Sequence, residues 1–236
     1  MTIHWCGTGL SAIPGLRKLI TDGHDIIVWN RTIEKAKSAV GDITNSIKEF
    51  NIHKLENQLE KGDIVVSMLP GEWHVPIAKL CLKCQSHFVS SSYISPEMRE
   101  LHNLALKTGL CLVNEVGLDP GIDHLMAHTL IEDYRNSKDQ NDENDISFFS
   151  YCGGIPKVKN PFCYKFSWSP LGVLKALKSP SRSIKNFKEF DARRPWNAIS
   201  TYTAPLPVPE EFEVYPNRDS VPFIDQYRLN NNWKIK

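Results

Sequence analysis

The chain has 236 residues, of which 41% are hydrophobic and 23% are charged, and its formal net charge is +1 at pH 7. These values are typical of a globular protein and lack the basic surplus of a nucleic-acid-binding protein. No apolar run is long enough to span a bilayer, and the chain begins on a strand-like segment without a signal sequence. We therefore expect a cytoplasmic protein that binds neither nucleic acid nor membrane.

Residues 2–114 alternate strand-like and helix-like patterns. In chain order, the expected elements are strand 3–6, helix 13–21, strand 25–29, strand 64–69, helix 73–84, strand 87–91, helix 96–107 and strand 110–113. The weaker pattern between 41 and 61 predicts a short strand near Ile43 and a helix over about 52–60. Such alternation predicts a Rossmann-type, doubly wound parallel sheet with helices on both faces.

The composition changes after Tyr134. Residues 136–145 are rich in Asn, Asp and Lys, which is typical of a solvated loop. Beyond this loop we expect strands of a second sheet at 146–152, 183–187 and 212–215, a helix at 171–177, and a strand-like end at 233–236. The predicted fold class is α/β, with a Rossmann domain at 1–120 and a partial α+β domain at 121–236 that is incomplete at its C-terminal end.

A glycine-rich turn follows the first strand and fits G-x-G-x-x-A, with Gly7, Thr8, Gly9, Leu10, Ser11 and Ala12. Gly7 allows a tight turn, Gly9 lets a pyrophosphate approach the backbone, and Ala12 allows close contact between helix and strand. The following helix directs its positive N-terminus at the phosphates. This context predicts dinucleotide binding.

The end of the second strand indicates which dinucleotide is bound. NAD-specific folds place a carboxylate about 20 residues on, whereas this chain has Asn30, Arg31 and Thr32. A guanidinium pairs well with phosphate oxygens, so the pattern favours the 2′-phosphate of NADP. The alternative is that Arg31 is a surface residue before a helix.

An acidic turn, residues 114–124, lies between a strand-like segment and an apolar-periodic one. Asp119 and Asp123 occur there with Pro120 and two glycines. In an open α/β sheet, ligands bind outside the carboxyl ends of the strands, so this turn predicts a functional site. Segments 67–70 and 90–93 present serines where the nicotinamide half should lie, although such serines also end strands or cap helices, as Ser95 is expected to do.

Cysteine and histidine patterns give no metal site. The six cysteines are irregularly spaced, mostly in apolar segments, and we expect them to be reduced and buried. Cys81 and Cys84 form a C-x-x-C without a second pair, so a redox or zinc role is not favoured. His124 and His128 are four residues apart but lack the glutamate of H-E-x-x-H, and we predict no metal.

These features together resemble the saccharopine reductase family, the NADP-dependent, L-glutamate-forming saccharopine dehydrogenases. The likeness covers nearly the whole chain. It is carried by GTGLSAIPG (7–15), WNRT (29–32), VSMLPGEWH (66–74), SSYISPEMREL (91–101), NEVGLDPGIDHLMA (114–127), SYCGGIPKVKNP (150–161), YKFSWSPLGVLKAL (164–177) and VYPNRDS (214–220). The blocks at 114–127 and 164–177 are specific to this family rather than general to Rossmann folds.

The resemblance implies an oxidoreductase of lysine biosynthesis or degradation. NADPH would reduce the imine formed from L-glutamate and 2-aminoadipate 6-semialdehyde, giving saccharopine. The second domain would be the substrate/catalytic domain. The implied cofactor contacts are Gly7, Thr8, Gly9, Leu10, Ser11, Ala12, Asn30, Arg31, Thr32, Met68, Leu69, Ser91, Ser92, Leu118, Asp119, Pro120, Ser167, Trp168, Ser169 and Gly172. The implied substrate contacts are Tyr93, Asp119 and Arg218, and the implied proton chemistry belongs to Asp119, Cys152 and Tyr93.

Physical chemistry suggests a separate role for each of these side chains. Asp119, near a helix start, is suited to orient and stabilise an iminium rather than to act as a strong acid. Because saccharopine has three carboxylates, a guanidinium such as that of Arg218 is expected as a clamp. Each residue also has a structural alternative: Asp119 as a helix cap, Cys152 as a packed strand residue, and Arg218 as part of a surface loop.

Three functions stay open from the sequence. The favoured one is the saccharopine reductase activity. A carboxynorspermidine dehydrogenase-like imine reductase would use similar chemistry on a diamine adduct, and an NADP-binding fragment would bind without turnover. Family members continue past residue 236, so catalytic competence and a homodimer through the second domain are open as well.

Overall fold

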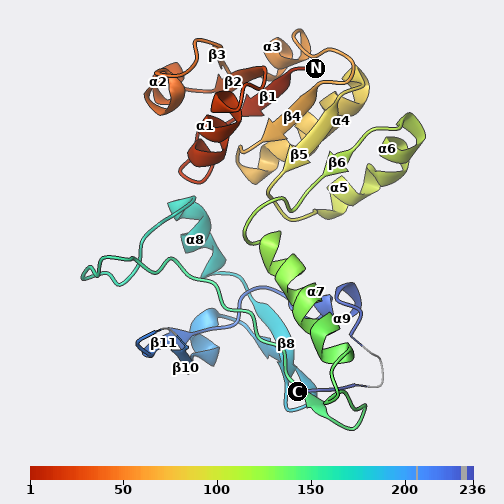
Figure 1. Ribbon diagram of the computed structural model, residues 1–236, viewed down its shortest axis with the longest axis vertical. Helices are drawn as coiled ribbons and strands as arrows, with labels where there is room; N and C mark the ends of the chain where they lie inside the picture. Colours follow the sequence, from red (N-terminus) through yellow and green to blue (C-terminus); the bar gives the residue numbers. More distant parts are fainter. Residues whose placement is uncertain (206, 230–232) are drawn as a thin grey trace. The chain divides into compact units, whose positions relative to one another are not determined.

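The computed structural model describes residues 1–205, 207–229 and 233–236, in which the chain forms two compact units. The first unit is Met1–His124 and the second is Leu125–Lys236 (Figure 1). Within the described ranges, no helix is both long and apolar enough to cross a bilayer.

Six strands form one sheet in the first unit, in the order β3-β2-β1-β4-β5-β6. Their bounds are β1 Ile3–Cys6, β2 Ile26–Asn30, β3 Ile47–Glu49, β4 Ile64–Ser67, β5 His87–Ser90 and β6 Leu112–Val113. Every neighbouring pair is parallel, so all the strands end at the same edge of the sheet. The order reverses between β1 and β4, where ligands bind in such folds. The predicted Rossmann-type sheet is confirmed.

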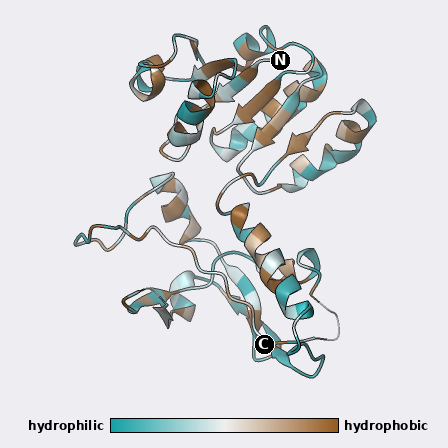
Figure 2. Cartoon of the chain, in the orientation of Figure 1, coloured by the Kyte–Doolittle hydropathy of each residue, from teal (hydrophilic) through white to brown (hydrophobic). Residues whose placement is uncertain are grey.

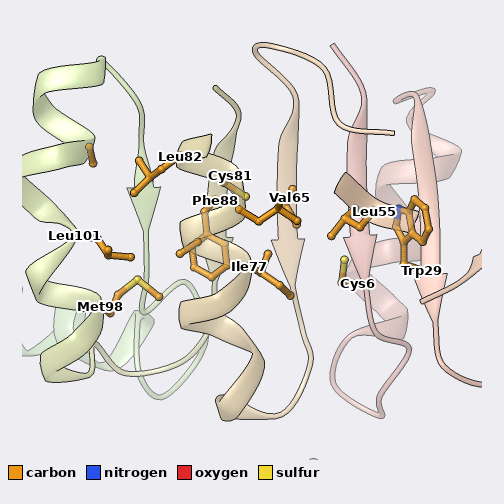
Figure 3. Close-up of a cluster of buried hydrophobic side chains, with 13 residues drawn as sticks. Cys6, Trp29, Leu55, Val65, Ile77, Cys81, Leu82, Phe88, Met98 and Leu101 are labelled. Atoms are coloured by element: carbon orange, nitrogen blue, oxygen red, sulfur yellow. The ribbon is translucent and has the colours of Figure 1, made fainter. Parts of the chain in front are cut away.

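Helices cover both faces of this sheet, as doubly wound folds require. Successive side chains of a strand point to opposite faces, and Trp5 and Cys6 of β1 accordingly join two different buried clusters. The central strands of the sheet are hydrophobic (Figure 2). The Trp5 cluster includes residues of α1 and α2. The Cys6 cluster includes residues of α3, α4, α5 and α6 (Figure 3). The helix bounds are α1 Ile13–Thr21, α2 Ile33–Val40, α3 Ile52–Glu56, α4 His74–Cys84, α5 Pro96–Glu100 and α6 His102–Thr108. A 3-10 turn, Gly71–Trp73, precedes α4.

Two local predictions for this unit are wrong. Ile43 lies in the turn that ends α2, where its backbone N–H donates to Val40 O, and the strand forms later because Ile47 pairs with Val28. The helix predicted at 96–107 is divided at Leu101, whose N–H donates to the carbonyl three residues back rather than four.

A buried histidine links the first strands of the sheet. Trp29 Nε1 donates to His4 Nδ1 over 3.1 Å, so Nδ1 carries no proton and Nε2–H is the donor to Asp63 Oδ2, 3.2 Å away. Asp63 also accepts from the backbone N–H groups of Thr2 and Glu60. Burial lowers the pKa of His4 below its usual 6.5, against the opposing effect of Asp63.

This network predicts a pH dependence of stability. As the pH falls below about 6.5, His4 binds a proton in the unfolded chain before it does so in the folded one, so the free energy of unfolding decreases. The loss amounts to about 1.4 kcal/mol for each pH unit between the two pKa values. Thermal unfolding of the wild type and His4→Gln measured across this range should therefore converge at lower pH. Parallel pH profiles would contradict a neutral His4.

The second unit has a small core and short strand pairs. Ala127 and Ile131 of α7 (Ile122–Arg135) pack against Tyr227, Leu229 and Trp233. The pairs are β7 Asp145–Ile146 with β12 Lys234–Ile235, β8 Ser181–Lys185 with β9 Lys188–Ala192, and β10 Ser200–Ala204 with β11 Glu210–Val214. Further helices are α8 Pro170–Ala176 and α9 Phe223–Gln226, with a 3-10 turn at Pro195–Ala198.

The prediction of one second sheet is therefore wrong for the described residues. In this unit their strands form separate two-stranded sheets. The strand expected at 146–152 is limited to Asp145–Ile146, because its partner β12 offers only two paired residues. The β8–β9 hairpin turns at Asn186 and Phe187, which both have positive φ, as a two-residue type I′ turn requires.

The cysteine prediction is correct in part. All six are free thiols, but only Cys6 and Cys81 are buried, and Cys111, Cys152 and Cys163 are exposed. Burial raises the pKa of Cys81 to about 12, and it also raises the pKa of Cys84. The C-x-x-C of α4 therefore holds protonated thiols at neutral pH, which are poor nucleophiles and poor metal ligands.

Candidate functional site

The glycine-rich turn fills residues 7–12, between the end of β1 at Cys6 and the start of α1 at Ile13. Gly7 has φ +107°, and a Cβ there would lie 2.7 Å from Met68 O, so only glycine fits. A Cβ at Gly9, in contrast, would have no heavy atom within 4 Å. The turn is thus tightly closed at Gly7 and open at Gly9.

The same turn has the features that a dinucleotide requires. Thr8 Oγ1 is buried and has no hydrogen-bond partner among the described residues. Leu10 and Ser11 are exposed, whereas Ala12 is buried in the Trp5 cluster. A phosphate beside the open backbone at Gly9 would supply the missing partner of Thr8, so the turn fits the predicted pyrophosphate.

The predicted NADP-selecting residues Asn30, Arg31 and Thr32 run from the last residue of β2 to the residue before α2. Asn30 Nδ2 donates to the backbone O of Thr32 over 2.7 Å, which fixes the loop around the exposed Arg31. Within the described chain, no carboxylate pairs with the Arg31 guanidinium. Thr32 occupies the N-cap position of α2 without a side-chain cap bond. Arg31 is therefore available to an anion.

The ends of β4 and β5 are joined by side chains. The His74 ring, at the start of α4, makes hydrogen bonds to Ser67 Oγ over 3.0 Å and to Ser92 Oγ over 2.8 Å. Ser91 Oγ lies 3.6 Å from Met68 Sδ, so two predicted cofactor contacts also meet. Burial lowers the pKa of His74. His74 was not predicted from the sequence, because no spacing rule links a helix-starting histidine to these serines.

The acidic turn approaches the end of β5. Tyr93 OH donates to Asp119 Oδ1 over 2.6 Å, which joins the two residues expected to act on the substrate. The turn is tightly closed, since a Cβ at Gly121 would lie 2.2 Å from Gly117 O. Leu118 and Asp119 are exposed and the Asp119–Pro120 peptide is cis. The carboxylate that caps the turn is Asp123, which accepts from Gly121 N–H over 2.7 Å.

The remaining predicted residues lie in the second unit. Ser169 caps α8 by accepting from Gly172 N–H over 3.1 Å, and the Trp168 ring packs where a Cβ of Gly172 would be. This packing gives the Ser167–Gly172 segment a structural role, whether or not it binds the cofactor. Cys152 is exposed and outside any strand, so the alternative of a packed strand residue is wrong.

Arg218 is held in a loop beside β8. It has φ +61°, and its carbonyl accepts from Arg182 N–H over 2.9 Å. The Arg182 guanidinium in turn binds both oxygens of Asp219 over 3.1 and 2.8 Å. The backbone hydrogen bond to the Arg218 carbonyl and the ion pair of Arg182 with the next residue, Asp219, thus fix the path of this loop. Among all the residues that the structure describes, no group of three or more His, Cys, Asp or Glu side chains could hold a metal ion.

Two family models match this chain and together cover nearly all of it. Residues 3–113 match the saccharopine dehydrogenase NADP binding domain, and residues 117–235 match the saccharopine dehydrogenase C-terminal domain. The first match agrees with the glycine-rich turn and confirms NADP(H) as the predicted cofactor.

Curated relatives give the same family. The chain is 35% identical over 231 residues to the NADP-dependent, L-glutamate-forming saccharopine dehydrogenases of Pyricularia oryzae and Saccharomyces cerevisiae, with 94% of this chain and 50% and 51% of those proteins covered. It is 34% identical over 209 residues to the mitochondrial alpha-aminoadipic semialdehyde synthase of Mus musculus, with 80% of this chain and 22% of that protein covered. The chain thus spans about half the length of the fungal relatives.

A solved structure extends the likeness to three dimensions. The apo saccharopine dehydrogenase (L-Glu forming) of Saccharomyces cerevisiae superposes with a TM-score of 0.81 at 32% identity, covering 99% of this chain and 53% of that one. The homospermidine synthase of Legionella pneumophila has a TM-score of 0.58 at 12% identity, with 100% and 70% covered, and shows a shared fold alone.

Proposed function

Because the chain belongs to the saccharopine dehydrogenase family, we propose that it acts in the NADP-dependent interconversion of saccharopine with L-glutamate and 2-aminoadipate 6-semialdehyde. The observation that carries the proposal is the hydrogen bond between Tyr93 and Asp119. The hydroxyl and the carboxylate follow strands that end at the same edge of the sheet as β1, and this supports a role for both in hydride chemistry on an imine.

When bound, NADP(H) supplies or accepts the hydride, and the side chains of the protein orient and stabilise the substrate. Asp119, with one oxygen held by Tyr93, keeps a negative charge in place to stabilise an iminium. Tyr93 and Cys152 are proposed to share the proton transfers, and Arg218 to bind a substrate carboxylate. The cofactor contacts are those that the sequence predicts, from the turn at 7–12 to the segment at 167–172.

The wider organisation is part of the same proposal. Residues 1–120 are assigned to NADP binding and residues 121–236 to the substrate. The substrates are small molecules, the location is cytoplasmic, and a homodimer would form through the second domain. The reaction would serve lysine metabolism, in the direction of synthesis or of breakdown.

Replacement of Arg31 should change the choice of cofactor. Arg31→Gln is expected to weaken NADPH binding about tenfold to a hundredfold, because it removes charge-assisted hydrogen bonds worth about 1.5–3 kcal/mol to the 2′-phosphate. NADH affinity should stay unchanged, since NADH lacks that phosphate. Calorimetry on both cofactors measures this, with Arg99→Gln, an exposed arginine of α5, as the matched control. Equal losses for NADPH and NADH would contradict the assigned role.

The reaction itself is tested by following NADPH absorbance with the purified chain, L-glutamate and 2-aminoadipate 6-semialdehyde. Oxidation of NADPH, but not of NADH, supports the proposal. Oxidation only when a diamine replaces L-glutamate would favour the carboxynorspermidine-type alternative. Binding of NADPH without turnover on any amine would overturn the enzymatic proposal for this chain and leave a nucleotide-binding fragment.

A further inference from the structure

We propose that His74 is a positioning residue for the nicotinamide half of the cofactor. His74 would hold Ser92 so that the hydroxyl hydrogen of Ser92 points towards the nicotinamide. The inference rests on the proposed function, because it assumes that NADPH binds at this edge of the sheet. Its basis is the continuous contact from Ser67 through the His74 ring to Ser92, over 3.0 and 2.8 Å.

The position of this chain of contacts is set by the sheet. Ser67 is the last residue of β4 and pairs with Cys6 of β1 and Ser90 of β5, so it lies beside the point where the strand order reverses. Ser92 follows β5 by two residues, at the same edge. A dinucleotide in a doubly wound fold crosses this edge, with its second half over the strands that follow the reversal.

The imidazole is held firmly. His74 is only 6% exposed, and its ring meets the Phe88 ring edge-on, with centroids 6.3 Å apart. Burial keeps the pKa of His74 low, so the ring is neutral at neutral pH and has one donor and one acceptor nitrogen. Which residue donates in each of the two hydrogen bonds of the ring therefore depends on which ring nitrogen carries the hydrogen.

Ser67 decides that direction. Its side chain is fully buried, and within the described chain the His74 ring is its hydrogen-bond partner. A buried hydroxyl hydrogen without an acceptor is costly, so Ser67 donates to Nδ1. The ring proton then lies on Nε2 and is donated to Ser92. Because the Ser92 oxygen accepts this bond, its own hydrogen is left for another acceptor, and the carboxamide oxygen of the nicotinamide is the acceptor that a cofactor brings there.

The test uses two replacements of His74 that keep different halves of the ring. His74→Gln retains a donor near Nε2 and can still bind Ser92, whereas His74→Asn retains only a group near Nδ1, towards Ser67. We expect His74→Asn and Ser92→Ala each to weaken NADPH binding about tenfold, or about 1.4 kcal/mol, and His74→Gln to weaken it less than about threefold. The double variant His74→Asn/Ser92→Ala should be no weaker than Ser92→Ala, because both remove one interaction.

A second ligand separates positioning from a general structural role. The probe is 2′-phospho-ADP-ribose, which has the adenosine, the phosphates and no nicotinamide, and all four variants should bind it as the wild type does. Equal losses in His74→Asn and His74→Gln, or equal losses for both ligands, would overturn the positioning role and leave the proposed function standing. A wild-type chain that binds neither ligand would overturn both, and thermal unfolding of each variant shows whether it is folded.

Discussion

Gly9→Ala is expected to weaken NADPH binding by about a hundredfold in a protein that still folds. A hundredfold loss corresponds to about 2.7 kcal/mol, the order of the charge-assisted hydrogen bonds that backbone N–H groups of the turn would donate to the pyrophosphate. The added methyl group would contact no protein atom, since nothing lies within 4 Å of a Cβ built at Gly9. It would instead fill the space through which the pyrophosphate approaches the backbone. Because φ at Gly9 is not positive, the thermal unfolding temperature should be unchanged or slightly higher. Calorimetry and thermal unfolding together measure both effects.

Gly7→Ala is the matched comparison in the same turn. Its Cβ would lie 2.7 Å from Met68 O at φ +107°, so this variant should lose about 1–3 kcal/mol of stability. The two neighbouring glycines thus separate a loss of binding from a loss of folding. Wild-type NADPH affinity in Gly9→Ala would mean that the nucleotide does not cross the turn at 7–12.

Most of the first unit could be predicted, because most of its elements outside residues 41–61 have a clear local pattern. Strands β1, β4 and β5 are short apolar runs between polar or glycine-containing turns, and helices α1 and α4 follow at the expected spacing. In the second unit, helix α8 and strands β8 and β11 lie within two residues of their predicted positions, but the other elements have no such pattern. The missed strand β9 is Lys-Glu-Phe-Asp-Ala, with three charges, and it forms because a two-residue turn folds it back on β8. Local sequence does not encode that pairing.

The candidate site was predictable to a similar degree. Parallel strands end at one edge, so the segments after β5 and β6 had to meet there, and the pair Tyr93–Asp119 follows from that geometry. The contact of Asp123 with Gly121, and not of Asp119 with the helix, depends on the exact path of the turn. The role of His74 depends on packing across two strands, which periodicity does not report.

Asp119→Asn should have the largest effect on turnover, lowering kcat/KM for the imine substrate by about 10²–10³. The variant keeps an oxygen that can accept from Tyr93, so the geometry of the turn survives while the charge that stabilises an iminium is lost. The Kd of NADPH should change much less than kcat/KM, because Asp119 is one of many proposed cofactor contacts whereas its charge acts on the iminium in the transition state. Rates of NADPH oxidation at saturating cofactor measure the effect.

Two comparisons assign the loss to the charge at this position. Tyr93→Phe removes the hydroxyl that orients Asp119 and that is proposed to take part in proton transfer, so it should cost at least about tenfold, the order of about 1–1.5 kcal/mol for one hydrogen bond. Asp123→Asn removes a second carboxylate of the turn but can still accept from Gly121 N–H, so near wild-type rates are expected. If Asp123→Asn were as slow as Asp119→Asn, the general negative potential of the turn would matter, and not a carboxylate held by Tyr93. If Asp119→Asn turned over normally, the iminium would have to be stabilised by a residue outside this turn.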